Sequence, residues 1–275
     1  ALDEASGLVN TTINVRFSTL VLFDHGTGSS TGTFALNSTL QGIGAPFKWV
    51  NFVPNGTSSL KGNISSYFAH FNLIILDFGK NSAINSSLKY AILNYQKMKE
   101  DNPSYPYSII FLGNETEDVL QGTYIGDRFG LNFNNYNVKP YGQGSNEYFY
   151  LYGINSTVSG NYGFFGNNIT NSYGIVVNAT QSSPIYNVTD TLPGGYEQIL
   201  SSSWNYVSSY GGPGIIFNDS GLKVSVLTFS ISSIWGIIQS HSSQYAPLSP
   251  TMDARSLFML MIMGYSGYVM NSPVP

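Results

Sequence analysis

The stretch Asn72–Gly79, NLIILDFG, decides the fold of this chain. Its apolar core, Leu73–Leu76, is continuous and does not alternate with polar residues. Strands that are covered on both faces have this character, whereas half-exposed strands alternate. A second stretch, Tyr107–Gly113 (YSIIFLG), contains a similar continuous apolar run. The two stretches therefore favour a parallel sheet with helices on both sides.

The segments around these two stretches fit the same scheme. Apolar runs at Leu20–Phe23 and Trp49–Val53 predict two earlier strands, and Ala83–Glu100 is predicted to be a helix. Its apolar residues recur at three- and four-residue steps, at Ile84, Leu88, Ala91, Ile92, Tyr95 and Met98. Strands alternating with helices predict an α/β fold with a doubly wound, mostly parallel sheet.

The second half of the chain has a different sequence composition and pattern. Residues 130–190 are rich in Asn, Gly and Tyr and predict a β-rich insertion or subdomain. Residues 211–235 read as two strands joined by a tight turn at Asp219–Gly221. A C-terminal helix follows, which is apolar all round from Leu257 to Met263 and is expected to be buried. We expect residues 1–275 to form a single α/β domain that contains this insertion.

The polar surface carries unusually little charge. Asp, Glu, Lys and Arg make up 9% of the chain, against about 25% in ordinary soluble domains. The net charge is −4 and no basic cluster occurs, which argues against nucleic-acid binding. Asn numbers 27 and Ser plus Thr 54. Amides and hydroxyls therefore replace much of the usual charge.

The chain contains eleven N-x-S/T sequons, whereas chance from this composition would give about five. We predict N-glycosylation at Asn10, Asn37, Asn55, Asn63, Asn85, Asn114, Asn155, Asn168, Asn178, Asn187 and Asn218. Glycosylation on this scale predicts an extracellular or cell-surface location.

The absence of cysteine narrows the expected habitat. A glycosylated, cysteine-free and weakly charged chain is typical of an archaeal surface protein. We expect a thermoacidophilic source, because a surface with few carboxylates has little stabilisation to lose in acid. The N-terminal ALDEASGLVN lacks a basic region and an apolar core, so we expect a mature chain that begins after cleavage. No run is long enough to predict a transmembrane span.

Several stretches together resemble the class I glutamine amidotransferase-like (flavodoxin-like) α/β domains. They are TLVLFD, NLIILDFG, YSIIFLGNETEDVL, GGPGIIFNDSGLKVSVLTFSIS and DARSLFMLMIM. The resemblance implies the fold. It also implies a nucleophilic Cys at the elbow after YSIIFLG, where this chain has Gly113-Asn114-Glu115. We therefore expect no amidotransferase chemistry and predict that the protein is not an enzyme.

The Gly/Ser/Thr-rich loop Asp24–Thr33, DHGTGSSTGT, is the most motif-like segment. Its position between a strand and a helix suits a phosphate cradle, but the Lys of a P-loop is absent, and a plain solvated βα loop is the favoured interpretation. We expect no cofactor. Asp24-His25-Gly26 and Asp219-Ser220-Gly221 also resemble the paired loops of acid proteases, although His25 stands where Ser or Thr is required.

Other catalytic patterns are missing from the sequence. No G-x-S-x-G elbow occurs, and His25, His70 and His241 lie far apart in the chain, so neither a catalytic residue nor a metal site is predicted. An aromatic group suits sugar stacking, a subunit contact or plain packing; it consists of Tyr148, Phe149, Tyr150, Tyr152, Tyr162, Phe164 and Phe165.

These observations favour a non-enzymatic, heavily N-glycosylated structural subunit of a surface assembly, such as an S-layer, sheath or filament. Its expected partners are copies of itself or other surface proteins, and covalent N-glycans. One alternative is a carbohydrate- or solute-binding ectodomain that uses the crevice at the carboxyl edge of the sheet. Another is a secreted acid hydrolase that uses Asp24, Glu115 or Asp219.

Overall fold

The computed structural model describes residues 18–23, 31–51, 67–78, 84, 86–104, 106–113, 116–137, 148–153, 173–178, 185–201, 211–239 and 254–268. The first half contains β1 (Thr19–Phe23), α1 (Thr31–Ile43), β2 (Phe47–Asn51), β3 (Leu73–Asp77), α3 (Ser86–Asp101), β4 (Ser108–Leu112), α4 (Thr116–Leu120) and α5 (Tyr124–Arg128). The second half contains β5 (Leu131–Asn137), β6 (Tyr148–Gly153), β7 (Tyr173–Asn178), β8 (Tyr186–Asp190), β9 (Tyr196–Ser201), β10 (Gly214–Asp219), β11 (Leu222–Leu227), the 3-10 turn η1 (Ile231–Ser233), β12 (Ile234–Gln239) and α7 (Ala254–Tyr265).

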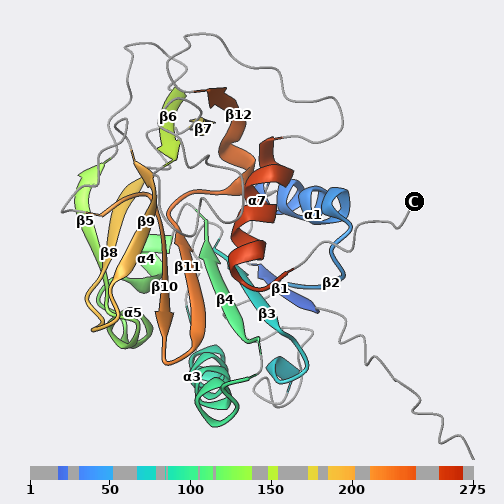
Figure 1. Cartoon of the computed structure of the whole chain (residues 1–275), viewed down its shortest axis with the longest axis vertical. Coiled ribbons are helices and arrows are strands. Elements are labelled where there is room, and N and C mark those ends of the chain that lie inside the picture. Colours follow the sequence, from blue (N-terminus) through green and yellow to red (C-terminus); the bar gives the residue numbers. More distant parts are fainter. Residues whose placement is uncertain are drawn as a thin grey trace, which may run out of the picture.

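The main sheet has ten described strands in the order β12-β7-β6-β9-β10-β11-β4-β3-β1-β2. Strands β2, β1, β3, β4 and β11 pair in parallel, whereas every pair from β11 through β10 to β12 is antiparallel. Helices cover the parallel half (Figure 1). The predicted α/β fold is confirmed, and the antiparallel extension is its main addition.

Both faces of the parallel strands are buried, as their continuous apolar sequences predict. Along β3, Ile75 faces the cluster that contains α1 and α7, and its neighbour Ile74 faces the cluster that contains α3. Strand β4 repeats the alternation with Ile110 and Phe111. All four side chains have no exposed surface. Because each successive side chain points to the opposite face, an unbroken apolar run is needed to fill both cores.

Helix α7 packs beside α1 on one face of the sheet (Figure 1). Phe258, Met259 and Met263 are completely buried there, which confirms the predicted burial of the C-terminal helix. In the described part of the chain, no helix combines the length and the apolar character that crossing a bilayer requires.

The segment 130–190 contributes to two sheets. β5 and β8 form a separate two-stranded antiparallel sheet, whereas β6 and β7 extend the main sheet between β9 and β12. This arrangement makes the segment β-rich in its described parts. The division of the whole chain into a single domain stays a prediction.

Candidate functional site

At the carboxyl edge of the parallel strands, the described residues include one buried carboxyl group, Asp77. It is the last residue of β3 and lies in register with Phe23 of β1 and Leu112 of β4. Its exposed fraction is 6%, and burial raises its pKa to about 7. Among the described residues it takes part in no ion pair. A carboxyl group that titrates near neutrality can act as an acid or a base, or donate a hydrogen bond as a neutral acid.

A pair of aromatic rings, Phe23 and Trp49, lies on β1 and β2, with Phe23 in register with Asp77 and Trp49 in register with Val21. The rings of Phe23 and Trp49 are tilted against each other with centroids 4.5 Å apart. Phe23 is 4% exposed and Trp49 is partly exposed. Ligands of open α/β sheets bind at this edge of the strands, so Asp77 marks the candidate site, with Phe23 on the neighbouring strand and Trp49 packed against Phe23. Sequence reasoning missed Asp77, although its position directly after a buried apolar run is the signal for it.

Gly113 directly follows β4, at the position where the sequence resemblance implied a nucleophile elbow. Gly113 has φ +123°, and a Cβ atom there would lie 2.2 Å from the carbonyl oxygen of Phe78. The hydroxyl of Thr116 donates to the carbonyl oxygens of Gly113, at 2.6 Å, and Leu227, at 3.2 Å. Only glycine fits this backbone, and Thr116 ties it to β11. Asn114 and Glu115 lie outside the described residues.

Asp219 lies at the opposite edge of the sheet. It pairs with Leu222 at the start of β11, which runs parallel to β4. The carboxyl end of β4 is about five residues further along, or roughly 16 Å. Asp219 and Asp77 are therefore too far apart to share a proton. Phe23, the residue before Asp24, lies at the Asp77 edge, and Asp24 itself lies outside the described residues.

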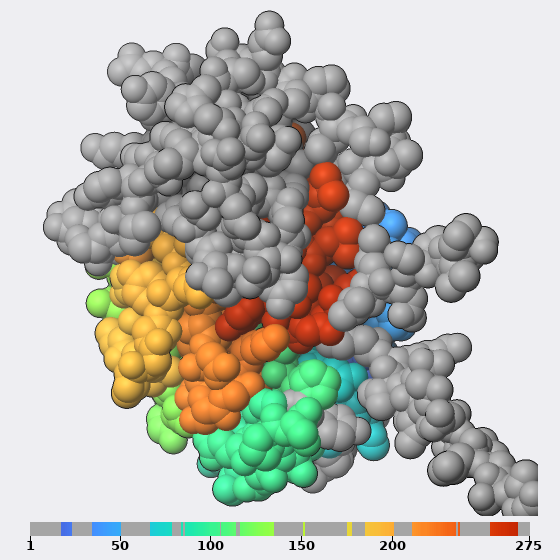
Figure 2. Space-filling model, viewed as in Figure 1, coloured from blue at the N-terminus to red at the C-terminus, as the bar shows by residue number. Residues whose placement is uncertain are grey.

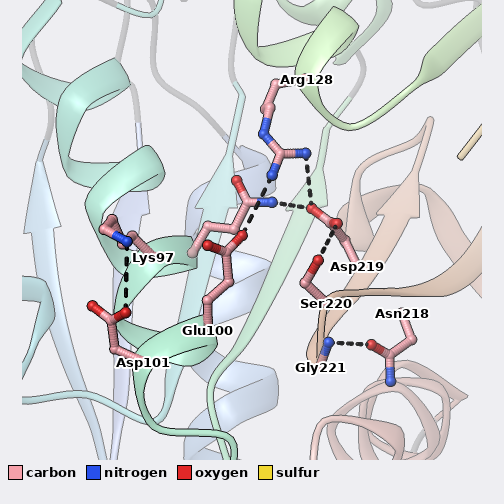
Figure 3. Close-up of polar contacts among 9 residues, drawn as sticks. Lys97, Glu100, Asp101, Arg128, Asn218, Asp219, Ser220 and Gly221 are labelled. Atoms are coloured by element: carbon pink, nitrogen blue, oxygen red, sulfur yellow. Dashed lines mark hydrogen bonds and ion pairs between the residues drawn. The ribbon is translucent and has the colours of Figure 1, made fainter.

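The side chain of Asp219 joins the β10–β11 turn to two helices (Figure 3). Its Oδ2 accepts hydrogen bonds from Gln96 of α3 and, at 3.4 Å, from Arg128 of α5. The Arg128 guanidinium also pairs with Glu100 at 3.6 Å, and the Ser220 hydroxyl donates to Oδ1 of Asp219 at 3.3 Å. We refer to this group, Gln96, Glu100, Arg128, Asp219 and Ser220, as the latch. Burial raises the pKa of Asp219, while Arg128 acts in the opposite direction.

Replacing Arg128 by methionine is expected to lower the free energy of unfolding at pH 7 by about 1–2 kcal/mol, because it leaves the 7% exposed Asp219 without its cation. The effect is smaller than for a fully buried pair because Arg128 is 35% exposed. The double variant Arg128→Met/Asp219→Asn should recover most of the loss. Urea unfolding of the three proteins measures this, and a double variant no more stable than the single one would contradict the latch.

Most of the remaining candidate residues lie outside the described part of the chain. His70 follows the short helical segment at 67–68, and His25 and His241 lie outside the described residues. No group of three or more metal-ligating side chains occurs in the described ranges. Most of the loop Asp24–Thr33 is likewise not described, but β1 ends at Phe23 and α1 begins at Thr31, so the segment joins a strand to a helix.

The described sequon asparagines have different surroundings. Asn218 is exposed at the end of β10, Asn187 is partly exposed on β8, and Asn37 lies within α1. Asn178 ends β7, but its side chain is not described. Of the predicted aromatic group, Tyr148, Phe149, Tyr150 and Tyr152 lie on β6, again without described side chains. All the other sequon and aromatic positions lie outside the described residues.

Taken together, the parallel strands and the helices that cover them define an α/β fold. No family model and no curated protein sequence matches the chain. Among solved structures, a ThuA-like protein from Parabacteroides merdae is similar, with 11% identity and a TM-score of 0.53 over 94% of this chain and 93% of that one.

Two further solved structures are similar at lower scores. A ThuA-like protein from Bacteroides uniformis has 10% identity and a TM-score of 0.45 over 91% of each chain. A glutamine amidotransferase from Thermotoga maritima has 13% identity and a TM-score of 0.41 over 78% of this chain and 76% of that one. The likeness to the ThuA-like protein from Parabacteroides merdae concerns the fold alone.

Proposed function

We propose that the protein is a non-enzymatic, N-glycosylated structural subunit of an extracellular surface assembly. The observation that carries the proposal is the pairing of eleven sequons with a charged fraction of only 9%. Subunits associate through apolar and amide-rich faces, and glycans cover the remaining surface. Depletion of charge at contact surfaces is typical of protein interfaces.

The perturbed carboxyl groups support an acidic habitat. Burial raises the pKa of Asp77, Glu117, Asp190 and Asp219 above their ordinary values. A carboxyl group with a raised pKa in the folded state makes folding less favourable once it ionises. Its cost disappears as the pH falls from the folded pKa to the unfolded value. These four groups therefore make the protein more stable in mild acid than at neutral pH.

Electron microscopy of the surface of the producing cells tests the proposed assembly. The proposal predicts a repeating layer, sheath or filament that contains this chain, labelled by a chain-specific antibody. Antibody label scattered over the surface without any order, on a protein that is always a dispersed monomer, would contradict it.

Asp77 favours a second candidate function, the binding of an uncharged sugar or other polyol at the carboxyl edge. A neutral Asp77 carboxyl donates a hydrogen bond to a hydroxyl, and the partly exposed ring of Trp49 supplies an apolar face for a sugar ring. Calorimetry with neutral glycans at pH 5 tests it: binding that is lost in Trp49→Ala and weakened in Asp77→Leu supports the candidate, and the absence of any heat removes it.

The hydrolase alternative gains no support from the described contacts. Asp219 is held in the latch by Gln96 and Arg128 at the edge opposite to Phe23. Secreted acid hydrolysis through Asp24, Glu115 or Asp219 therefore stays a prediction, and retained hydrolysis in the double variant Asp24→Asn/Asp219→Asn would remove it.

A further inference from the structure

A sequon needs an asparagine amide and a hydroxyl two residues later, and the sequons at Asn218 and Asn37 differ in how the fold places these two groups. Asn218 is the penultimate residue of β10, and Ser220, with φ +53°, lies in the turn that follows this strand. Asn37 and Thr39 both lie in the middle of the 13-residue helix α1, where residues i and i+2 do not face each other. The two sequons therefore lie in different local structures.

At the β10–β11 turn, both groups of the sequon are exposed. Asn218 and Ser220 are exposed, and Asp219 between them is buried in the latch. The Oδ1 atom of Asn218 accepts a hydrogen bond of 2.7 Å from the backbone N–H of Gly221. Figure 3 shows the side-chain nitrogen, the atom that carries an N-glycan, directed away from Gly221. The turn thus orients the amide outward.

In helix α1, the hydroxyl and the amide oxygen of the sequon are buried, although Asn37 as a whole is partly exposed. Thr39 is 2% exposed, and its hydroxyl has no hydrogen-bond partner among the described residues. The same holds for the amide oxygen of Asn37. This helix packs against α7 and η1, so a sugar on Asn37 would begin at an amide group that is half enclosed by the protein. A bulky, hydrated glycan belongs on an open surface.

We infer that the folded protein carries a glycan on Asn218 and none on Asn37. The inference deepens the proposed function and rests on it, because it names which sequon of a surface glycoprotein is modified. The glycan projects beside the C-terminal end of α3, where Lys97, Glu100 and Asp101 gather, and Figure 2 shows α3 and the β10–β11 hairpin side by side on one face. That end of the molecule faces solvent in the assembly, and subunit contacts form elsewhere.

Site-resolved mass spectrometry of the protein taken from the producing cells tests the inference. The peptide that contains Asn218 should carry a sugar mass, and the peptide that contains Asn37 should have its unmodified mass. Two variants sharpen the result. Asn218→Asp keeps the acceptor for Gly221 and should lose the glycan, whereas Thr39→Val destroys the other sequon at nearly constant shape and should leave the total glycan mass unchanged.

The possible outcomes separate the inference from the proposed function. A sugar on Asn37, or a bare Asn218 while other sequons are occupied, overturns the inference and leaves the glycoprotein proposal standing. A chain that is bare at all eleven sequons overturns both. Loss of glycan mass in Thr39→Val, with an unchanged melting temperature, would also overturn the inference.

Discussion

Replacing Asp77 by asparagine is expected to stabilise the protein at pH 7 by about 4 kcal/mol. Burial raises the pKa of Asp77 from 3.8 to about 7. A difference of roughly three pH units corresponds to about 4 kcal/mol of preference for the neutral form in the folded state. Asparagine has nearly the same shape and stays neutral at every pH. The variant therefore removes the cost of burying the charge.

The sign of the pH dependence follows from the direction of the shift. Above pH 7 the carboxylate is ionised in both states, and the folded state bears the full cost. Between pH 7 and about 4, the folded state takes up a proton before the unfolded state does, so the free energy of unfolding rises as the pH falls. Below about pH 3.8 both states are protonated and the contribution is gone.

Urea unfolding at pH 4 and pH 8 measures the effect. The natural chain should be less stable at pH 8 than at pH 4, and Asp77→Asn should remove the larger part of that difference. Asp118→Asn is the matched control, because Asp118 is exposed on α4. An Asp77 variant that is destabilised at pH 8 would show that the carboxylate is compensated by a partner, contrary to this account.

Replacing Gly113 by alanine is expected to destabilise the protein by about 3 kcal/mol or more. The backbone at Gly113 has φ +123°, a region that residues with a Cβ atom rarely adopt. A Cβ atom would also lie 2.2 Å from the carbonyl oxygen of Phe78, so the backbone of β3 or β4 must move. The movement would disturb the bonds from Phe78 N to Leu112 O and from Gly113 N to Phe229 O.

Gly44→Ala provides the matched control. Gly44 also has a positive φ, +72°, but no atom lies within 4 Å of the position of its Cβ. Its substitution therefore tests the backbone conformation alone and should cost about 1–2 kcal/mol. Thermal unfolding of both variants separates the two contributions. Equal losses in the two variants would contradict a steric role for the turn after β4.

The sequence predicted the parallel half of the fold well, because its strands are buried on both faces. The runs at Leu73–Leu76 and Ser108–Leu112 can satisfy two cores only as central strands, and they are β3 and β4. Boundaries were less accurate. The predicted strand Trp49–Val53 begins two residues earlier, at Phe47, and residues 52–53 lie outside the described part of the chain. The predicted helix Ala83–Glu100 is observed as Ser86–Asp101.

Features that depend on contacts between distant parts of the chain could not be predicted from sequence patterns. No local signal shows that β6 and β7 join the main sheet beside β9 and β12, since strand pairing depends on partners that are distant in the chain. The contact between Gln96 and Asp219 spans 123 residues. Similarly, the pKa of Asp77 is raised to about 7 because the end of β3 is buried by elements that are distant in the sequence. Neither the composition nor the local sequence pattern contains this information.

The oligomeric state of the protein taken from the surface of the producing cells, measured without denaturant, tests the proposed function most directly. A structural subunit is expected to appear in particles much larger than a 30.0 kDa chain, with copies of itself or other surface proteins. Recovery of this chain only as a dispersed monomer would contradict the proposal.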